Sequence, residues 1–422
     1  MNARTYPVLL LAGLAAANAA HAGITVGSTW SLAPGLAPSG VAIADFNADG
    51  HGDIACCIDA PGGIRLMLGS ATGTFILGGF TSLGANAGAG EIVAGDFDGN
   101  GSVDLAVILK NQGAVRILAN NGAGVFTTLA TLATGEDGSG PSTGDLDSDG
   151  DLDMVVANSA VDTVSVLRNN GGGSFTVIEL AAGADPRGAT FGDFDGNGTM
   201  DIASTAHDDR TLVLFRNKAG SFAPWTTIPI SNLMRPQDAK AADLNNDGRT
   251  DLAVAAKGDA GSYLLTYLAG KAGLGAANTL AVPGGGAIQL ALGDLDCDGD
   301  VDAAMADAHG NRALLAENAG DGTFGNPVIV NAGLNTVAVA IGDLDGAMSL
   351  DVAAVASDDD SLTVALTACV VAVPGDLDGD GMVGGSDLTI LLAGWGQPGP
   401  SDLDGDGNTS ASDLTILLAN WG

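Results

Sequence analysis

The sequence contains few basic residues and almost no glutamate. Its 422 residues include 15 lysines and arginines against 50 aspartates and glutamates, which gives a formal net charge of −35. Because like charges repel, nucleic acid and anionic membrane surfaces are poor partners. Only four of the acidic residues are glutamates, and the other 46 are aspartates. Aspartate in such excess indicates tight turns and ligands for hard cations.

Charged residues as a whole are scarce, at 15%, whereas glycine is abundant, with 65 residues. Hydrophobic residues make up 46% of the chain, which is enough for a large core and excludes global disorder. Abundant glycine with little glutamate and lysine argues against a mostly helical protein. It favours many short strands joined by tight turns.

Long hydrophobic runs are absent except near the N-terminus, where residues 8–20 are apolar and Ala20-His21-Ala22 precedes Gly23. This small-x-small pattern predicts a secretory signal peptide over residues 1–22. The run is shorter than the roughly 20 residues that a membrane span needs. We therefore expect a secreted, extracellular protein, free or associated with the cell surface, without a membrane span.

Cysteine is also scarce. The four residues, Cys56, Cys57, Cys297 and Cys369, are too few for a disulfide scaffold of this size, and the sequence does not assign their partners. Export would allow a bridge.

One nine-residue motif recurs seven times. Its copies are DFNADGHGD from Asp45, DFDGNGSVD from Asp96, DLDSDGDLD from Asp145, DFDGNGTMD from Asp193, DLNNDGRTD from Asp243, DLDCDGDVD from Asp294 and DLDGAMSLD from Asp343. Successive copies begin 51, 49, 48, 50, 51 and 49 residues apart. Such a constant period indicates a structural unit of about 50 residues.

Each unit contains four strand-like segments separated by turns, and the third turn is rich in asparagine and glycine and commonly ends in phenylalanine. Seven four-stranded units predict a mostly β protein, a seven-bladed β-propeller. The seventh unit stops after three strands, so we expect the N-terminal segment Ile24–Leu32 to complete its blade and remove an exposed edge. The propeller would span residues 23–369, followed by a linker over 370–374.

The motif has the chemistry of a calcium loop. Positions 1, 3 and 5 are Asp or Asn and position 6 is Gly in six copies, while position 9 is Asp in all seven. Oxygen ligands on alternate residues of a curled loop converge on one point, and the position 7 carbonyl adds another. The alternative is an unmetallated turn between strands. The predicted ligands are Asp45, Asn47, Asp49, His51 and Asp53; Asp96, Asp98, Asn100, Ser102 and Asp104; Asp145, Asp147, Asp149, Asp151 and Asp153; Asp193, Asp195, Asn197, Thr199 and Asp201; Asp243, Asn245, Asp247, Arg249 and Asp251; and Asp294, Asp296, Asp298, Asp300 and Asp302.

The seventh copy departs from this pattern because Ala347 and Met348 replace the fifth-position ligand and the turn glycine. We expect weak or no calcium occupancy at Asp343, Asp345 and Asp351.

These loops and the Asn/Gly/Phe turns resemble the FG-GAP or VCBS repeats of integrin-α-like propellers over about residues 24–368. The resemblance implies calcium between the first two strands of each blade and a scaffold for adhesion or ligand recognition. Members of such a fold family differ widely in function, so the resemblance does not imply an enzyme.

A second repeat with a 26-residue period occupies residues 375–422. Two twelve-residue loops with Asp at positions 1, 3, 5 and 12 each precede a short apolar segment that is predicted to be helical. Their predicted calcium ligands are Asp376, Asp378, Asp380, Met382 (carbonyl) and Asp387, and Asp402, Asp404, Asp406, Asn408 (carbonyl) and Asp413.

This pair of EF-hand-like loop-helix units resembles a type I dockerin. The resemblance implies a calcium-folded module that binds a cohesin-like partner through Gly385-Ser386, Ala411-Ser412 and the following helices. The helices lack Lys and Arg and end in Trp395-Gly396 and Trp421-Gly422, which departs from that pattern. The alternative is a calcium-stapled tail that caps or anchors the protein.

Few residues remain for catalysis. The calcium loops contain 33 of the 50 acidic residues, and His51, His207 and His309 lack metal-ligand spacing. The sequence has no nucleophile elbow, phosphate-binding Gly-Lys motif or HExxH pattern. We therefore expect no catalytic residues and no cofactor besides calcium.

Strand parity places the calcium loops on one face of the ring and the turns between second and third strands on the other. A ligand face is predicted there, including Arg187, Arg235 and Gln237 from the connections between blades. The turn residues are Lys110, Asn111, Asn158, Asp162, His207, Asp208, Asp209, Arg210, Lys257, Asp259, Asp307, His309, Asn311, Asp358, Asp359 and Asp360. The alternative is a set of solvated loop tips.

The main hypothesis is a secreted, calcium-stabilised, non-catalytic propeller that binds a glycan or an extracellular protein and carries a docking or anchoring module. The first alternative is an extracellular polysaccharide-degrading enzyme or cellulosome-like component delivered by that module, which needs an acid pair in the central channel. The second is a purely structural surface protein.

Overall fold

The computed structural model describes residues 24–32, 36–218, 220–259, 261–271, 273–369, 375, 377, 383–397, 399, 401–404 and 407–421. The predicted signal peptide, residues 1–22, and the predicted linker, residues 370–374, lie outside the described residues.

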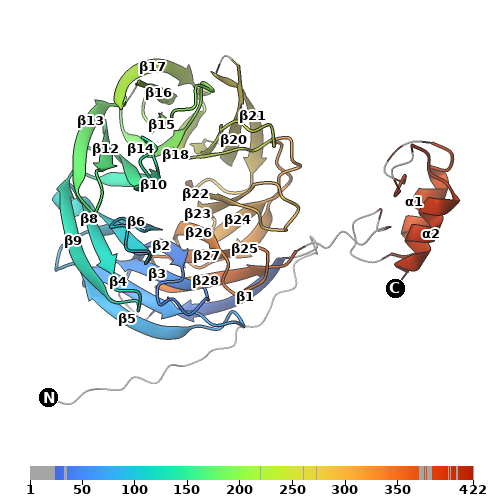
Figure 1. The fold of residues 1–422 in the computed structure, drawn as a ribbon, viewed down its shortest axis with the longest axis horizontal. Helices are drawn as coiled ribbons and strands as arrows, with labels where there is room; N and C mark the ends of the chain where they lie inside the picture. Colours follow the sequence, from blue (N-terminus) through green and yellow to red (C-terminus); the bar gives the residue numbers. More distant parts are fainter. Residues whose placement is uncertain are drawn as a thin grey trace.

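Twenty-eight described strands form seven four-stranded antiparallel sheets that stand around a ring as the blades of a propeller (Figure 1). Blades 1 and 2 contain β2 (Pro38–Ala44), β3 (Asp53–Ile58), β4 (Gly63–Leu68) and β5 (Ile76–Ser82), then β6 (Ala89–Gly95), β7 (Asp104–Leu109), β8 (Ala114–Asn120) and β9 (Phe126–Ala133). Blades 3 and 4 contain β10 (Gly138–Gly144), β11 (Asp153–Asn158), β12 (Thr163–Asn169) and β13 (Phe175–Ala181), then β14 (Pro186–Gly192), β15 (Asp201–Ala206), β16 (Thr211–Lys218) and β17 (Ser221–Pro229). Blades 5 and 6 contain β18 (Met234–Ala242), β19 (Asp251–Gly258), β20 (Gly261–Gly270) and β21 (Gly273–Val282), then β22 (Ala287–Gly293), β23 (Asp302–Asp307), β24 (Arg312–Ala316) and β25 (Val328–Asn331).

Blade 7 closes the ring with strands from both ends of the propeller. It contains β26 (Thr336–Gly342), β27 (Asp351–Ala356) and β28 (Ser361–Thr367), and the N-terminal strand β1 (Ile24–Ser31) pairs antiparallel with β28. The predicted closure is therefore confirmed. An N-terminal strand covers the β28 edge, which would otherwise present unpaired backbone groups.

The second strand of each blade is its most buried element. Every residue of β3, β7, β11, β15, β23 and β27 is buried. These strands lie inside their sheets with a blade on either side, so both faces need apolar or small side chains, as in DLAVIL of β7. The fourth strands, such as β5, are largely exposed.

The propeller core is divided among the spaces between neighbouring blades. Seven hydrophobic clusters of described residues each draw side chains from two adjacent blades, as Phe46 and Leu105 do between blades 1 and 2. Cys56 and Cys57 are free, buried thiols in β3, and burial raises the pKa of Cys56 to about 12. They serve as small core side chains.

A disulfide joins Cys297, in the loop after β22, to Cys369, beyond β28. It links blade 6 covalently to the end of blade 7. The sequence alone did not assign this pairing.

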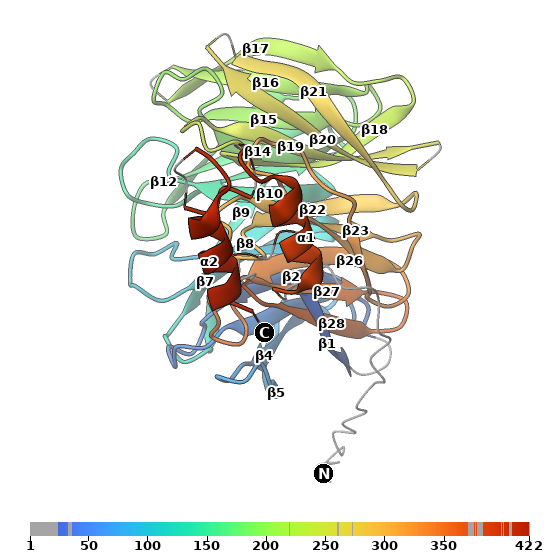
Figure 2. The same ribbon diagram turned by 90° about the vertical axis from the view of Figure 1, so that its right-hand side faces the viewer.

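The C-terminal repeat forms two short helices, α1 (Gly385–Ala393) and α2 (Ala411–Ala419), which lie side by side (Figure 2). Val383, Leu391 and Leu417 form their small buried core, while Trp395 and Trp421 are about half exposed. Neither helix is long or apolar enough to cross a membrane, and the described residues contain no other candidate span.

Candidate functional site

The nine-residue loops all lie between the first and second strands of their blades and share one face of the ring. In the first loop, Asp45 Oδ1 accepts the Asp49 N–H at 3.2 Å and Oδ2 accepts the Gly50 N–H at 2.8 Å. The side chain of Asn47 accepts the same Asp49 N–H, and Asp49 accepts that of His51. These successive turns curl the backbone and bring the oxygens of alternate residues together.

The ninth aspartate of each loop has a role that the sequence did not reveal. In blade 1, Asp53 Oδ2 accepts the N–H of Phe46, at the loop's start, at 3.0 Å. Its Oδ1 accepts the N–H of Gly69, in the turn between the third and fourth strands, at 2.8 Å. Each such charge-assisted bond contributes about 1.5–3 kcal/mol. The buried carboxylate therefore clasps two loops of the blade together.

This carboxylate clasp recurs around the ring. Six of the seven ninth-position aspartates accept both backbone bonds: Asp53, Asp104, Asp153, Asp251, Asp302 and Asp351. The exception is Asp201 in the fourth loop. Its Oδ1 accepts the Asn217 N–H, whereas its Oδ2 is buried and has no hydrogen-bond partner among the described residues. Position 9 thus stays Asp in the degenerate seventh loop because the clasp needs it.

Asparagines at the start of the third turn connect the clasp region of their blade to the preceding blade. Asn120 Nδ2 donates to Phe46 O in blade 1 at 2.8 Å and to Val103 O in its own blade at 2.9 Å. Asn169, Asn217 and Asn318 bond to the preceding blades in the same way. A single amide therefore satisfies carbonyls of two blades.

Carboxylates converge at the predicted metal positions. In at least four loops, oxygens of the first, third and ninth residues lie within 4.8 Å of one another: Asp96, Asp98 and Asp104; Asp145, Asp147 and Asp153; Asp193, Asp195 and Asp201; Asp294, Asp296 and Asp302. Burial, followed by repulsion from these neighbours, raises the pKa of Asp302 to about 7 and that of Asp153 to about 6. Each loop concentrates negative charge that a divalent cation would neutralise.

Two of these groups also contain a buried oxygen without a hydrogen-bond partner, Asp147 Oδ1 and Asp201 Oδ2. In the first case Arg168 Nε donates to the other oxygen, Asp147 Oδ2, at 2.6 Å. Arg216 Nε lies 2.6 Å from Asp195 Oδ2 in the next loop. The donor sets in loops 3 and 4 therefore fit a hard cation. In both loops an arginine pairs with Oδ2 of the third residue, Asp147 or Asp195.

Backbone conformation sets the seventh loop apart. In the other six loops the sixth residue is a glycine with φ between +82° and +93°: Gly50, Gly101, Gly150, Gly198, Gly248 and Gly299. Met348 occupies this position in loop 7, is 85% exposed and does not adopt a positive φ. The loop lacks both the fifth ligand and the turn that would bring it inward.

The described part of the C-terminal repeat shows a related arrangement. Asp413, the twelfth residue of its loop, accepts the N–H groups of Leu403 at 2.6 Å and Ser410 at 2.6 Å. Asp387 accepts those of Leu377 and Gly384. Asp402 Oδ1 is buried and has no hydrogen-bond partner among the described residues. The predicted ligands Asp376, Asp378, Asp380, Met382 and Asp406 lie outside the described residues.

The opposite face of the ring is hollowed by a central cavity of about 580 Å³. Every first strand has a β-bulge at the same point of its pairing with the second strand. A bulge re-aims a side chain, and here the side chains at or next to the bulges line the cavity. They are Ser39, Glu91, Ser139, Arg187, Gln237, Ile288 and Val337, one from each blade.

Polar side chains from opposite sides of the ring meet at the cavity. Gln289 Nε2 of blade 6 donates to Glu91 Oε2 of blade 2 at 3.1 Å, and the Gly140 N–H donates to the same oxygen. Burial, and then the Asp238 carboxylate, raise the pKa of Glu91. Asp238 accepts backbone bonds on both oxygens, from Ala239 and Leu290. Asp238 is therefore a structural carboxylate rather than an acid free to act with Glu91.

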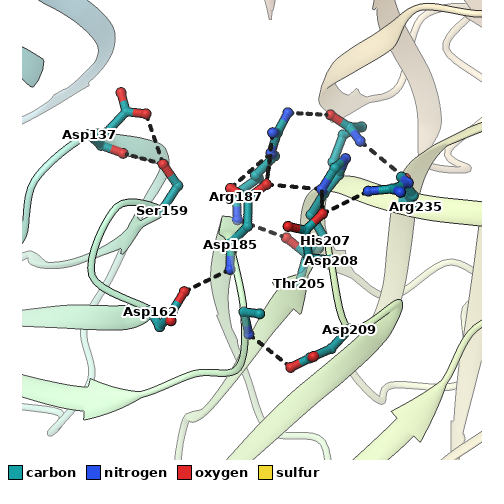
Figure 3. Close-up of polar contacts among 12 residues, drawn as sticks. Asp137, Ser159, Asp162, Asp185, Arg187, Thr205, His207, Asp208, Asp209 and Arg235 are labelled. Carbon is teal, nitrogen blue, oxygen red and sulfur yellow. Dashed lines mark hydrogen bonds and ion pairs between the residues drawn. The ribbon is translucent and has the colours of Figure 1, made fainter.

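An ion-pair network occupies the cavity rim at blades 4 and 5 (Figure 3). His207 Nδ1 lies 3.0 Å from Asp185 Oδ2 and 3.0 Å from Asp208 Oδ1. Arg187 pairs with Asp185 at 2.8 Å, and Arg235 pairs with Asp208 at 2.7 Å. Burial and the Arg187 charge lower the pKa of His207. Each of the two carboxylates is paired with an arginine, so the group forms an ion-pair network.

The predicted ligand face divides into available and structural residues. Lys110, Asn111, Arg187 and Gln237 line the cavity. Asn158 is buried and donates to Ser165 Oγ at 2.8 Å. Asp307 is buried against Arg312, so these two residues, which the sequence placed in turns of the ligand face, are the buried last residues of β11 and β23. Asp162, Asn311 and Asp360 accept backbone N–H groups of the connections between blades.

Sequence reasoning missed Ser39, Glu91, Ser139, Ile288 and Val337 of the cavity lining. Aligned on the loops, each stands five or six residues before the first aspartate of its motif. This position changes between Ser, Glu, Ile and Val while the loops stay uniform, and that contrast was the available signal.

A model of the FG-GAP-like repeat matches residues 45–107, 96–156, 145–204, 202–254 and 243–305. These segments together cover more than half of the chain. The chain belongs to the FG-GAP-like repeat family. The matches contain the first six loops and end before the seventh, so the degenerate loop and the C-terminal repeat lie outside the FG-GAP-like match. No curated protein matches the sequence.

Solved structures share the propeller fold at low sequence identity. BBS1N, in a complex with ARL6DN, has a TM-score of 0.56 at 12% identity, covering 81% of this chain and 96% of that one. A Lactobacillus plantarum protein has a TM-score of 0.54 at 14% identity, covering 71% and 86%. A catalytically inactive Staphylococcus aureus virginiamycin B lyase with quinupristin has a TM-score of 0.53 at 10% identity, covering 80% and 98%. At these identities the likeness establishes the fold alone.

The inter-blade amide predicts a difference between adjacent asparagines. Asn120→Ala leaves the Val103 carbonyl without this donor and the Phe46 carbonyl with only the Gly124 N–H, and an unsatisfied buried group costs about 1–3 kcal/mol. We expect a clearly lower melting temperature for N120A. Asn121→Ala is the matched control, because Asn121 is exposed in the same turn. Equal melting temperatures for the two variants would contradict the bridging role.

Proposed function

We propose that this protein is a secreted, calcium-stabilised, non-catalytic propeller that binds a glycan or an extracellular protein on the face opposite its calcium loops. The central cavity is the observation that carries the proposal. The loops on one face of the ring have nearly the same sequence. On the opposite face, the side chains at or next to the β-bulges differ between most blades. A uniform scaffold with one variable concave surface suits recognition.

Calcium is supported by the donor chemistry of the loops. The carboxylates converge, aspartate pKa values are raised, and Asp147 Oδ1 and Asp201 Oδ2 are buried without a hydrogen-bond partner among the described residues. These observations indicate that the negative charge of the loops is not compensated without a cation. Oxygen-only donor sets in flexible loops favour Ca²⁺ over Mg²⁺. Six ions in the propeller and two in the C-terminal repeat would cancel nearly half of the formal charge of −35.

The C-terminal repeat is proposed as a dockerin-like docking or anchoring module. Its two helices share a small core and expose Leu392, Leu418 and both tryptophans. This apolar surface suits a cohesin-like partner. The duplicated loop-helix sequence supports the assignment, and a tail that only anchors the protein is the competing role.

Catalysis is the second candidate function. Glu91 lies in the cavity with a raised pKa, as a general acid would require. Its electrostatic neighbour Asp238 is held by two backbone N–H groups, so Asp238 does not supply the second acid that glycoside hydrolysis needs. This observation favours recognition over hydrolysis.

Restoring the seventh loop should restore its calcium site. Ala347→Asp with Met348→Gly supplies the fifth ligand and the turn glycine, and both positions are exposed, so the core is undisturbed. Equilibrium dialysis should show about one more bound calcium per chain than in the wild type. Wild-type binding at loop 7 as tight as at the other loops would contradict the ligand count.

The ligand face can be tested with two lysines on opposite faces. Lys110 lines the cavity, and Lys218 is exposed at the end of β16, beside the calcium loops. Ligands would be identified on a glycan array and an extracellular protein array with calcium present. We expect Lys110→Ala to weaken binding several-fold and Lys218→Ala to leave it unchanged.

The reverse pattern would overturn the assignment of the ligand face. Release of reducing sugars from a bound polysaccharide would favour the enzyme, and absence of any ligand would favour a structural role.

A further inference from the structure

A second, smaller pocket lies on the same face between blades 4 and 5. Its volume is about 140 Å³, and Arg210, Asn232, Leu233, Arg235, Lys257 and Asp259 contribute to its lining. Three basic residues and one acid thus meet in one pocket of a chain with only 15 lysines and arginines and a net charge of −35. Asp208 pairs with Arg235 at the rim, and among the described residues neither Arg210 nor Lys257 forms an ion pair, so the basic groups outnumber the one remaining acid, Asp259.

Arg210 has an unusual backbone conformation. It is the last residue of the turn between the second and third strands, and its φ is +56°. The equivalent residues in five other blades also have positive φ, and they are Gly62, Gly113, Asp162, Asn311 and Asp360. Glycine, asparagine and aspartate tolerate this region, whereas a long side chain is disfavoured there. Blade 4 therefore keeps an arginine at a position that local backbone energetics would give to another residue.

Arginine also gives up a hydrogen bond that the related turns make. Asp162 Oδ1 accepts the Asp185 N–H at 2.9 Å, and Asn311 Oδ1 accepts the Asn335 N–H at 2.8 Å. The corresponding backbone position in blade 5 is Arg235, which stands eight residues before the first aspartate of its loop, as Ala37, Asp185 and Asn335 do. A guanidinium has no acceptor atom and cannot replace this contact.

The guanidinium itself is incompletely satisfied. Arg210 Nε is buried and has no hydrogen-bond partner among the described residues. A buried polar group without a partner is costly, and such groups in native structures commonly await a ligand, an ion or water. Arg210 thus combines backbone strain, a side chain that cannot accept the backbone hydrogen bond of the related turns, and a donor without a partner. Backbone strain of this kind is a feature of binding and catalytic sites.

We propose that this pocket binds a carboxylate of the ligand, with Arg210 as its main recognition residue. The planar guanidinium matches a carboxylate in shape and charge, and Lys257 adds a second positive charge. Asn232 and Asp259 add polar groups for the uncharged part of the ligand, and exposed Leu233 offers an apolar contact. The site deepens the proposed recognition function by naming the chemical group that one part of the face selects.

The test uses the full chain and Arg210→Asn, which copies the residue found in the equivalent turn of blade 6. Isothermal titration would compare glucuronate with neutral glucose, and acetate would serve as a sugar-free carboxylate. We expect glucuronate to bind, glucose not to bind, and R210N to weaken glucuronate at least tenfold. The melting temperature of R210N should rise, because asparagine adopts the turn more readily and can accept a backbone N–H, as Asn311 does in blade 6.

Lys218→Asn is the matched control, since it removes one positive charge from the calcium face of the same blade. Displacement of glucuronate by acetate would identify the carboxylate alone as the determinant, and failure of displacement would assign part of the affinity to the sugar. Equal binding of glucose and glucuronate would overturn the proposal. So would unchanged affinity in R210N, or no carboxylate binding at millimolar concentration.

The outcomes also separate this proposal from the proposed function. A ligand of the cavity that still binds to R210N and does not compete with glucuronate would refute the carboxylate site alone. Carboxylate binding at Arg210 without any array ligand would refute the wider recognition function alone.

Discussion

The buried carboxylate of the ninth loop residue is the interaction on which each blade depends. It joins the loop after the first strand to the turn after the third, and so fixes all four strands at one end of the sheet. The cost of burying this charge is offset by two backbone donors. The raised pKa values of Asp153, Asp302 and Asp351 show that the compensation is incomplete. A cation at the loop would complete it, and we propose that calcium does so.

The clasp and the proposed binding surface lie at opposite ends of the sheets. The clasp and the inter-blade asparagines lie at one end of the sheets, where six loops repeat nearly the same residues. At the other end the bulged positions and the second turns carry Glu91, Arg187 and Arg210 without disturbing the clasp. Because the two ends are linked only through well-packed strands, recognition residues can vary at little cost to stability. Arg210 illustrates the separation, since its strain is confined to one turn.

The repeated nine-residue loop allowed the fold to be predicted from the sequence. The constant spacing of the aspartate loops predicted seven blades, and the missing fourth strand predicted the partner of β28. Two other features had no local signal. The Cys297–Cys369 bridge depends on how blades 6 and 7 meet, and the bulges depend on register between strands. The burial of Asn158 and Asp307 was missed because turn composition does not report whether a neighbouring side chain covers the turn.

We propose that calcium completes a charge balance that the protein alone leaves open. A ligand that binds only the native state stabilises it by about 2.7 kcal/mol per site at 100 times its dissociation constant. The most direct test is the thermal unfolding of the mature chain in saturating calcium and in excess chelator. The account predicts a large fall in melting temperature on chelation. Superimposable melting curves would contradict it.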